Sequence, residues 1–341
     1  MKTNFDPNAI SPKNGCFLGL KHTVADSDIV LQQAPWDVTT SYRPGTVYGP
    51  ECIIEASYQL DMYSPYVKDA WNTKIATIPM SQEWKKLSAS LRSEAVKVIS
   101  ALEKGASEDD PEIKAILARV NDRGATFHHQ LYVETKALLE KNKKVVTVGG
   151  DHSVTLGPLR AYVEKYPDLS VLHIDAHADL REAYEGFTHS HASIMYNVIQ
   201  ETKLKRLVQV GIRDVSPAEI KLIESSDRIK TFFDWNLKNK AYEGNTWKQI
   251  ADEIVATLST QVYISFDIDG LDPKYCPNTG TPVPGGLEFD QAVYLFQSVK
   301  KAGKKIVGGD LLEVAPGGNG DQWDGNIGAR ALWQVCLSMV G

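Results

Sequence analysis

The sequence has no long apolar run, no close pair of cysteines and no excess of basic residues. No apolar run approaches the roughly 20 residues that cross a bilayer, and the polar start, MKTNFDPNAISPKNG, lacks a signal-peptide core. Acidic residues (43) outnumber basic ones (37), so we expect no nucleic-acid partner and no membrane contact. The scattered cysteines predict reduced thiols in a cytoplasmic protein, not a disulfide framework (Cys16, Cys52, Cys276 and Cys336).

What the chain does contain is an ordinary globular composition and a regular alternation of strand-like and helix-like segments. Its 341 residues, 43% of them hydrophobic, are enough for one large α/β domain or two small ones. From residue 145 onward, continuous apolar segments alternate with helical ones, which is the pattern of a parallel sheet covered on both faces. We therefore predict a single α/β domain.

The element bounds are predicted from hydrophobic period, capping residues, proline and glycine. Strands are predicted at 29–34, 145–148, 170–175, 206–211, 228–233, 262–267 and 304–311. Helices are predicted at 49–60, 81–105, 111–121, 124–142, 154–165, 192–200, 216–226, 246–258, 289–302 and 324–339. Residues 62–79 are expected to be irregular. Residues 1–28 would form an N-terminal arm, and residues 29–341 the domain, with a helical insert at about 81–142.

One predicted strand ends in a group of metal-ligand side chains. The segment VLHIDAHADL delivers Asp175, His177 and Asp179 at its end. Side chains on a strand alternate between faces, so these three can converge while the backbone stays extended. Two carboxylates and an imidazole aimed at one point would repel or be desolvated unless a cation joined them. A divalent metal is the simplest interpretation, and a solvated acidic strand end is the plain alternative.

Two further strand ends carry the same kinds of side chain. His152 follows the strand at 145–148 after a diglycine, and Asp267 and Asp269 end the strand at 262–267. Alone, the histidine could start a helix and the aspartates could cap a turn. Ligand sites of parallel sheets lie beyond the carboxyl ends of the strands, where all six side chains fall. Their charge is too large for one cation and suits two divalent ions that share bridging carboxylates.

The chemistry of the ligand set also indicates which metal to expect. Carboxylates dominate it and cysteine is absent, so manganese is favoured, with nickel, cobalt, iron or zinc as alternatives. A water shared by two such ions would be acidic enough to act as hydroxide near neutral pH.

Several segments resemble the signature motifs of one enzyme family. GGDHS, DAHADLR, SHAS, SFDIDGLDP, TGTPVPGGL and LLEVAPG are similar, in this order, to those of the ureohydrolases, which include arginase and agmatinase. The resemblance covers roughly residues 29–340. It implies a three-layer α/β/α domain around a mostly parallel sheet and two Mn(II) ions. It also implies hydrolysis of a guanidinium group to urea and an amine, and a homo-oligomer, commonly a trimer or hexamer.

The resemblance assigns a role to each candidate ligand. One ion would be bound by His152, Asp175, Asp179 and Asp267, and the other by His177, Asp175, Asp267 and Asp269. Asp179 would also orient the attacking hydroxide.

Two further residues match positions that handle the substrate. His191, in SHAS, would shuttle protons because an imidazole titrates near neutral pH, with His189 as its rival. Glu313, in LLEVAPG, would pair with the planar guanidinium through charge-assisted bonds. The plain alternatives are a surface histidine and a glutamate paired with Arg330.

The loop after DAHADLR indicates the substrate. REAYEGF at 181–187 lacks the pattern with which animal-type arginases hold the amino-acid groups and is closer to agmatinases. We therefore expect agmatine, hydrolysed to putrescine and urea in polyamine metabolism. Arginine stays open. Trp323 would close a smaller pocket, which keeps guanidine, a guanidino acid and a Ni(II) site open. A non-catalytic metal-binding relative is the alternative from another class.

Overall fold

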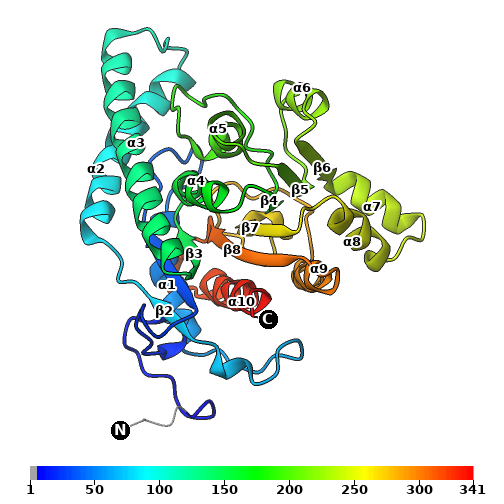
Figure 1. Cartoon of the computed structure of the whole chain (residues 1–341). Helices are drawn as coiled ribbons and strands as arrows, with labels where there is room; N and C mark the ends of the chain where they lie inside the picture. The colour runs from blue at the N-terminus through cyan, green and yellow to red at the C-terminus, as the bar shows by residue number, and fades with distance from the viewer. Residues whose placement is uncertain (1–5, 341) are drawn as a thin grey trace.

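The computed structural model describes residues 6–340, and an eight-stranded sheet forms its centre (Figure 1). The strands lie in the order β2-β1-β3-β8-β7-β4-β5-β6, and every neighbouring pair is parallel. Their bounds are β1 Ile29–Ala34, β2 Ile75–Thr77, β3 Lys144–Gly149, β4 Leu169–Ile174, β5 Arg206–Ile212, β6 Ile229–Phe233, β7 Gln261–Asp267 and β8 Lys305–Leu312. The predicted parallel sheet is confirmed.

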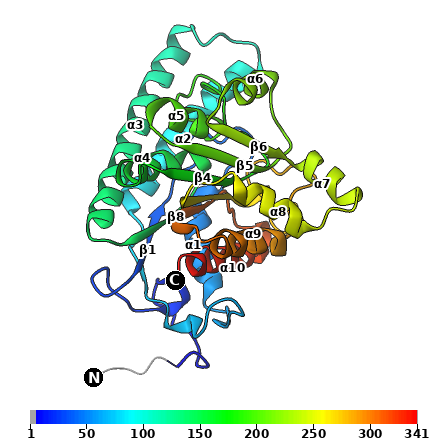
Figure 2. The ribbon, with the colours of Figure 1, turned by 45° about the vertical axis from the view of Figure 1, so that its right-hand side comes forward.

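Helices cover both faces of this sheet, which makes three layers (Figures 1 and 2). On one face lie α1 Gly49–Ser57, α7 Asp234–Tyr242, α8 Trp247–Ala256, α9 Phe289–Lys301 and α10 Trp323–Ser338. On the other lie α3 Pro111–Glu140, α4 Leu156–Lys165, α5 Ile194–Glu201 and α6 Pro217–Ser225, and α2 Gln82–Glu103 packs beside α3. Branched apolar side chains of the central strands are buried against both helix layers, because parallel strands with crossover helices leave neither face to solvent.

The structure differs from the predicted elements in three places. Residues 111–121 and 124–142 were predicted as separate helices, but α3 is continuous from Pro111 to Glu140, and Gly124 is buried within it. Tertiary packing overrides the roughly 1 kcal/mol that glycine costs in a helix. The short strand β2 lies in the stretch expected to be irregular, and α7 was not predicted. α7 buries only Asp234 and Leu237, so it lacks an apolar stripe that the sequence could reveal.

The helices α2 and α3 pack on the domain through an aromatic cluster. Trp36, just after β1, stacks on Phe127 of α3 with ring centroids 4.3 Å apart. Trp84 of α2 meets both rings edge-on. Such aromatic pairs stabilise a contact beyond what the burial of their apolar area contributes. The two helices are therefore held against the loop that follows β1.

Part of the segment before β1 packs on the domain, whereas residues 6–15 are largely exposed. Phe17 and Leu18 are fully buried in the core beside α1 and β2. Their backbone N–H groups donate to Thr77 and Ser57. Residues 1–5 of the predicted arm and residue 341 lie outside the described residues.

Residues 6–340 contain neither a membrane-spanning helix nor a disulfide bond. None of their helices combines the length and apolar character that a bilayer crossing requires. All four cysteines in them are free.

Candidate metal centre and active site

The four central strands of the sheet each deliver a side chain to one place. His152 follows β3, Asp175 follows β4, Asp267 ends β7 and Glu313 follows β8. These strands are neighbours in the order β3-β8-β7-β4. Their register aligns Ile174 with Phe266 and Asp267 with Leu312, so the strands end at the same level. The site therefore lies beyond the carboxyl ends of the strands, as predicted.

Two glycines allow the backbone to approach closely enough to build this edge. A Cβ on Gly150 would lie 1.8 Å from the carbonyl oxygen of Trp36. A Cβ on Gly270 would lie 2.6 Å from the backbone nitrogen of Asp175. Both contacts are with backbone, which cannot move aside as a side chain can. The glycines in the motifs GGDHS and DIDGLDP are thus required by close approach.

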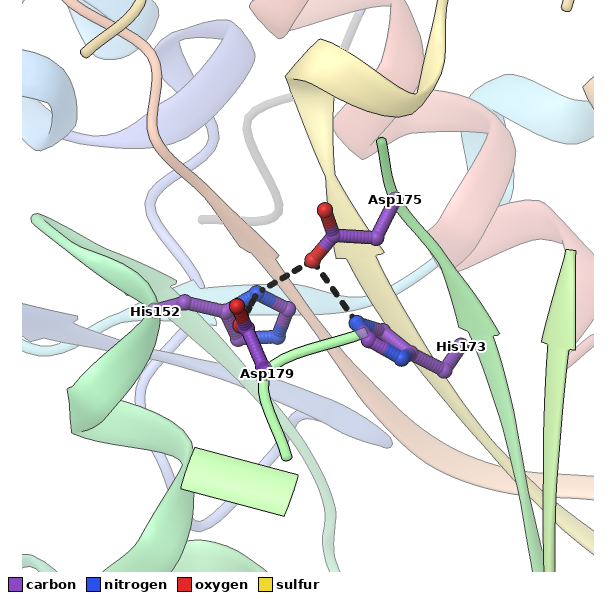
Figure 3. Close-up of side chains that lie close together, drawn as sticks. All are labelled: His152, His173, Asp175 and Asp179. Atoms are coloured by element: carbon purple, nitrogen blue, oxygen red, sulfur yellow. Dashed lines mark hydrogen bonds and ion pairs between the residues drawn. The ribbon is translucent and has the colours of Figure 1, made fainter. Parts of the chain in front are cut away.

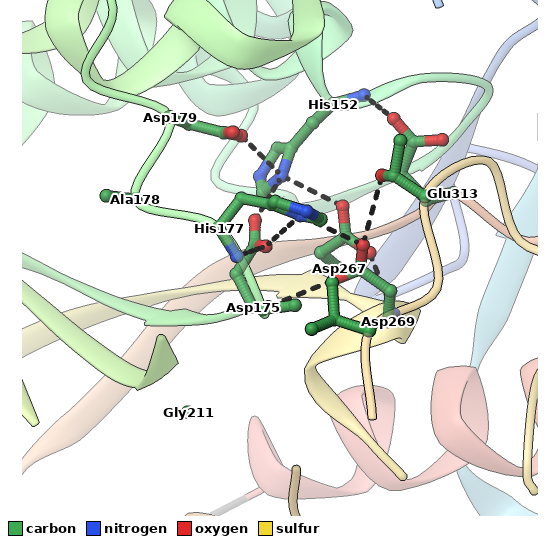
Figure 4. A network of polar contacts seen from close by, with 12 residues as sticks. His152, Asp175, His177, Ala178, Asp179, Gly211, Asp267, Asp269 and Glu313 are labelled. Atoms are coloured by element: carbon green, nitrogen blue, oxygen red, sulfur yellow. Dashed lines mark hydrogen bonds and ion pairs between the residues drawn. The ribbon is translucent and has the colours of Figure 1, made fainter. Parts of the chain in front are cut away.

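The imidazole of His152 faces three carboxylates. Its Nδ1 lies 3.0 Å from Asp175 Oδ2, 3.2 Å from Asp267 Oδ2 and 3.3 Å from Asp179 Oδ2 (Figures 3 and 4). His152, Asp175 and Asp267 are almost completely buried. One nitrogen and three oxygens from three strand ends thus converge on a single point.

A second point of convergence lies next to the first. His177 Nδ1 is 3.2 Å from Asp269 Oδ2 and 3.5 Å from Asp175 Oδ1 (Figure 4). Asp175 turns one oxygen toward His152 and the other toward His177. The backbone N–H of Asp269 donates to Asp267 Oδ1 at 2.8 Å, which links the carboxylate at the first point to a residue of the second. The structure therefore brings together all six predicted ligand side chains.

A buried histidine within β4 orients Asp175. Gln209 donates from Nε2 to the Ala178 carbonyl and to His173 Nδ1, at 2.7 and 3.1 Å. His173 Nδ1 is therefore an acceptor, and its proton is on Nε2, which donates to Asp175 Oδ2 at 2.8 Å. Burial lowers the pKa of His173, which agrees with this neutral form. His173 is a support for Asp175, because both of its nitrogens already have partners.

A second buried chain orients His152. Ser265 donates its hydroxyl to Asp310, so its oxygen accepts from His152 Nε2 at 2.9 Å. Thr155 and the backbone N–H of Phe266 also donate to Asp310. The proton on Nε2 leaves the lone pair of Nδ1 free to face the three carboxylates. This is the arrangement in which a histidine binds a metal, with its other nitrogen held by a hydrogen bond.

The electrostatics show that the cluster needs positive charge. Burial, and then the charges of Asp175 or Asp269, raise the pKa values of Asp179 and Asp267 well above their usual range. Burial lowers the pKa values of His152 and His177, but the neighbouring carboxylates outweigh it and raise them well above the ordinary value. Without cations, protons would have to supply the missing charge.

Divalent cations fit this donor set. It contains imidazole nitrogens and carboxylate oxygens without sulfur, and it forms two adjoining groups around a shared Asp175. Hard divalent ions favour such ligands, and two ions can share a bridging carboxylate. The buried cluster therefore fits a binuclear metal site.

Glu313 lies beside this cluster with one oxygen engaged. Its Oε1 accepts from the backbone N–H of His152 at 2.9 Å, whereas its buried Oε2 has no hydrogen-bond partner within residues 6–340. Burial, and then Asp151, raise the pKa of Glu313 well above its usual range. Its backbone has φ 61°, a strained left-handed conformation held by Thr279 Oγ1, which donates to the Glu313 carbonyl at 2.7 Å. Arg330 instead pairs with Asn326, so the ion pair considered as the alternative is not formed.

His191 is buried where its own loop meets the loop that follows β1. The backbone N–H of Ser41 donates to His191 Nε2 at 3.3 Å, and the Ser41 hydroxyl lies 3.2 Å from the same nitrogen. Nε2 therefore carries the lone pair, and the proton of the neutral ring is on Nδ1, 3.8 Å from Glu313 Oε1. Burial lowers the pKa of His191 to about 3, so the ring is neutral in this position. The rival His189 stands apart, with its ring against His128.

A cavity of about 300 Å³ opens over the cluster. Its floor includes His177, Asp179 and His191. The remaining lining comes from the loop that carries these three residues, from three other loops and from α6, and comprises Ser41, Tyr42, Arg181, Tyr184, Ala192, Asp214, Glu219, Thr281 and Val283. The structure does not bring Trp323 to this cavity, because its indole is half exposed and donates to the Lys274 carbonyl. Glu313 is not among the lining residues either, but its Oε1 lies 3.8 Å from His191 Nδ1, which is at the cavity.

Comparison with known proteins agrees with this geometry. The family model described as the arginase family matches residues 27–341. The chain belongs to the arginase family. Its fold is that of the family: the agmatine ureohydrolase of Thermoplasma volcanium superposes with a TM-score of 0.72 at 24% identity, covering 96% of this chain and 95% of that chain.

Named relatives within the arginase family cover most of the chain. The N(1)-aminopropylagmatine ureohydrolase of Thermus thermophilus is 32% identical over 93% of this chain and 91% of its own length. The agmatinase of Bacillus cereus is 29% identical over 85% of this chain and 84% of its own length. The protein is thus a ureohydrolase that cleaves the amidine C–N bond of a guanidino compound.

Proposed function

We propose that this arginase-family protein hydrolyses agmatine to putrescine and urea with two Mn(II) ions. One observation carries the guanidino part of the proposal: Glu313, a buried carboxylate, keeps one oxygen unpartnered within residues 6–340 beside the cluster. A guanidinium group would supply both the missing hydrogen bond and the opposite charge.

The ligand sets are those that the family resemblance implies, and the two convergence points support them. His152, Asp175, Asp179 and Asp267 would hold one ion, and His177, Asp175, Asp267 and Asp269 the other. When bound, two such ions lower the pKa of a water and stabilise negative charge that develops at the guanidinium carbon. Nickel is the alternative to manganese, and metal analysis of the protein tests the choice.

The protein side chains would then perform three tasks. Glu313 binds the guanidinium and fixes its plane, which removes the orientation cost. Asp179 accepts a hydrogen bond from the attacking water and aims its oxygen at the guanidinium carbon. The attacking water forms the new C–O bond and gives up its protons, and His191 carries a proton from it to the departing amine as the C–N bond of the tetrahedral centre breaks. The products are urea and a free amine.

The charge of the cavity wall supports a substrate with a cationic tail. The carboxylate of Asp214 lines the wall, is exposed, and makes no ion pair within residues 6–340. Glu219 lies on the same wall, where Leu180 N–H and the Ser216 hydroxyl donate to it. The single cation there, Arg181, stacks over Tyr184 and lies 4.0 Å from Glu219. An ammonium group would therefore find Asp214 available as its counter-ion.

Urea release from a series of guanidino compounds tests the proposal. We expect the highest kcat/KM with agmatine, compared with arginine, guanidine, guanidinopropionate and guanidinobutyrate, each with Mn(II) and with Ni(II). Asp214→Asn should raise KM for agmatine about fivefold, because an exposed ion pair contributes about 1 kcal/mol, and leave KM for guanidine unchanged. Metal content is the control. Release of urea from none of these compounds would favour a non-catalytic metal-binding protein.

A second candidate substrate is N(1)-aminopropylagmatine. The Thermus thermophilus relative of that name is 32% identical over nearly the whole chain. Its additional amine would also suit an acidic wall. A kcat/KM for this compound above that for agmatine would decide in its favour.

Oligomer and location complete the proposal. We expect a homo-oligomer, a trimer or hexamer, in the cytoplasm, with a role in polyamine metabolism. The free cysteines are consistent with a reducing compartment. Light scattering of the purified protein measures its mass directly.

A further inference from the structure

The helices α2 and α3 contact both loops that meet at His191. One is the loop at 37–47, which contains Ser41, and the other is the loop at 180–193, which contains His191 itself. Neither helix lines the cavity. Val38 and Phe187 of these loops pack in an apolar cluster with both helices. In addition, single polar side chains of the two helices bond the loop backbone, in partly buried positions at Arg92 and partly exposed ones at Asn121.

From α2, two side chains hold the loop at 37–47. Arg92 donates through Nη1 to the carbonyls of Val38, at 3.1 Å, and Thr40, at 2.5 Å. Ser88 bonds both the backbone N–H and a carboxylate oxygen of Asp37. The other oxygen of Asp37 accepts from the N–H groups of residues 45 and 47, which closes the loop. Ser41 directly follows the carbonyl that Arg92 holds.

From α3, one side chain holds the loop at 180–193. Asn121 donates through Nδ2 to the Gly186 carbonyl at 3.1 Å and accepts from the Thr188 N–H at 3.0 Å. The Thr188 carbonyl in turn accepts from Asn197. A neutral amide that both donates and accepts fixes the peptide planes on either side of residue 187, three residues before Ser190, which caps the short helix bearing His191.

The two held loops meet in the hydrogen bond from Ser41 N–H to His191 Nε2. We propose that Arg92 and Asn121 are positioning residues that hold His191 in register for proton transfer. The proposal rests on the function proposed above. It gives the helices α2 and α3 a part in turnover, although neither Arg92 nor Asn121 touches the cavity.

The location of the Arg92 contacts makes them costly to lose. Thr40 is fully buried and Val38 is fully buried, so their carbonyls would lose their partner without access to bulk water. The backbone N–H of Ser41 belongs to the same peptide unit as the Thr40 carbonyl and donates directly to the ring of His191. A displacement of about 1 Å at a proton-transfer group can cost about 100-fold in rate.

Kinetics in two backgrounds test the inference. Arg92→Met and Asn121→Ala should each lower kcat about tenfold in the wild-type background and change KM less than about twofold. In a His191→Ala background the same substitutions should lower kcat less than about twofold, because the group that they position is absent. Arg92→Lys, which can still donate to both carbonyls, should restore most of kcat.

Arg119→Met is the matched control. Arg119 on α3 pairs with Glu94 on α2 and contacts neither loop, so its loss perturbs the same helices without reaching His191. We expect wild-type kcat. If Arg92→Met lowers kcat equally with and without His191, or does not lower it at all, the proposal is overturned in favour of a purely structural role.

Crystal structures supply a readout that does not depend on turnover. In the metal-loaded wild type we expect the 3.3 Å contact between Ser41 N and His191 Nε2, and in Arg92→Met a separation beyond about 4 Å. If the ring moves but no guanidino compound is hydrolysed by the wild type, the proposed function fails and the positioning holds. If the ring of His191 keeps its position in both Arg92→Met and Asn121→Ala, the positioning role is overturned.

Discussion

Two of the proposed metal-ligand side chains depend on residues inside the strands. His173 lies two residues before Asp175 on β4 and orients it, and Ser265, two residues before Asp267 on β7, orients His152 across the sheet. Side chains two apart on a strand share a face, so the strand that delivers a ligand also delivers its support. This period was present in the sequence as HID and SFD, but only the pairing of β3, β8 and β7 shows which ligand each support reaches.

Ser265→Ala tests the role of these supports. Loss of the hydroxyl removes the acceptor for His152 Nε2–H and leaves Asp310 short of a donor. We expect metal affinity to fall about 10- to 100-fold, measured by titration of metal-free protein with Mn(II). Ser338→Ala is the control, because Ser338 is equally buried but bonds only Val335 on α10. Equal affinity in both variants would contradict the assignment of His152 as a ligand.

Glu313→Gln tests guanidinium binding at the residue scale. The amide keeps the size of the side chain but loses the charge that a guanidinium requires. We expect kcat/KM to fall about 100-fold, since a hydrogen bond to a charged group contributes up to about 3 kcal/mol. Metal content, measured by atomic emission, should stay unchanged because Glu313 lies outside both convergence points. An unchanged kcat/KM would indicate a substrate bound through another group.

At the scale of elements, the strand ends were predictable and the helix contacts were not. The apolar runs followed by Asp or His predicted where β3, β4 and β7 end to within one residue, because burial on both faces leaves a continuous hydrophobic signal. The bonds from α2 and α3 to the loops left no such signal. Arg92 and Asn121 occupy ordinary positions on amphipathic helices, and only the fold places them beside residues more than 50 positions away.

Gly150→Ala tests the close approach between the β1 and β3 loops. The added Cβ would lie 1.8 Å from the Trp36 carbonyl, so one loop must move and carry His152 with it. We expect the free energy of unfolding to fall by at least about 3 kcal/mol, measured by denaturant titration, together with loss of bound metal. Gly318→Ala provides the comparison, since nothing lies within 4 Å of its Cβ. Similar stability of the two variants would contradict the geometry.

At the scale of the whole molecule, the candidate metal centre lies where the four central strands meet. Strands β3, β8, β7 and β4 form the middle of the sheet, and each contributes a buried carboxylate or imidazole at its end. Repulsion among these groups acts on the centre of the domain, not on a peripheral loop. Bound cations would therefore stabilise the entire fold by cross-linking the strand ends, and their removal should be felt globally.

Thermal unfolding with and without metal tests this coupling. A ligand at 1,000 times its Kd stabilises the folded state by about 4 kcal/mol, which corresponds to about 6 °C in Tm for a domain of this size, because the unfolding entropy is about 2 cal/mol/K per residue. We expect chelation to lower Tm by about that amount and added Mn(II) to restore it. Asp267→Ala, which removes a carboxylate that faces His152 and is proposed to hold both ions, should abolish both metal binding and the Tm shift. A full metal-dependent shift in this variant would show that the ions bind elsewhere, since a site without Asp267 lacks the carboxylate assigned to both ions.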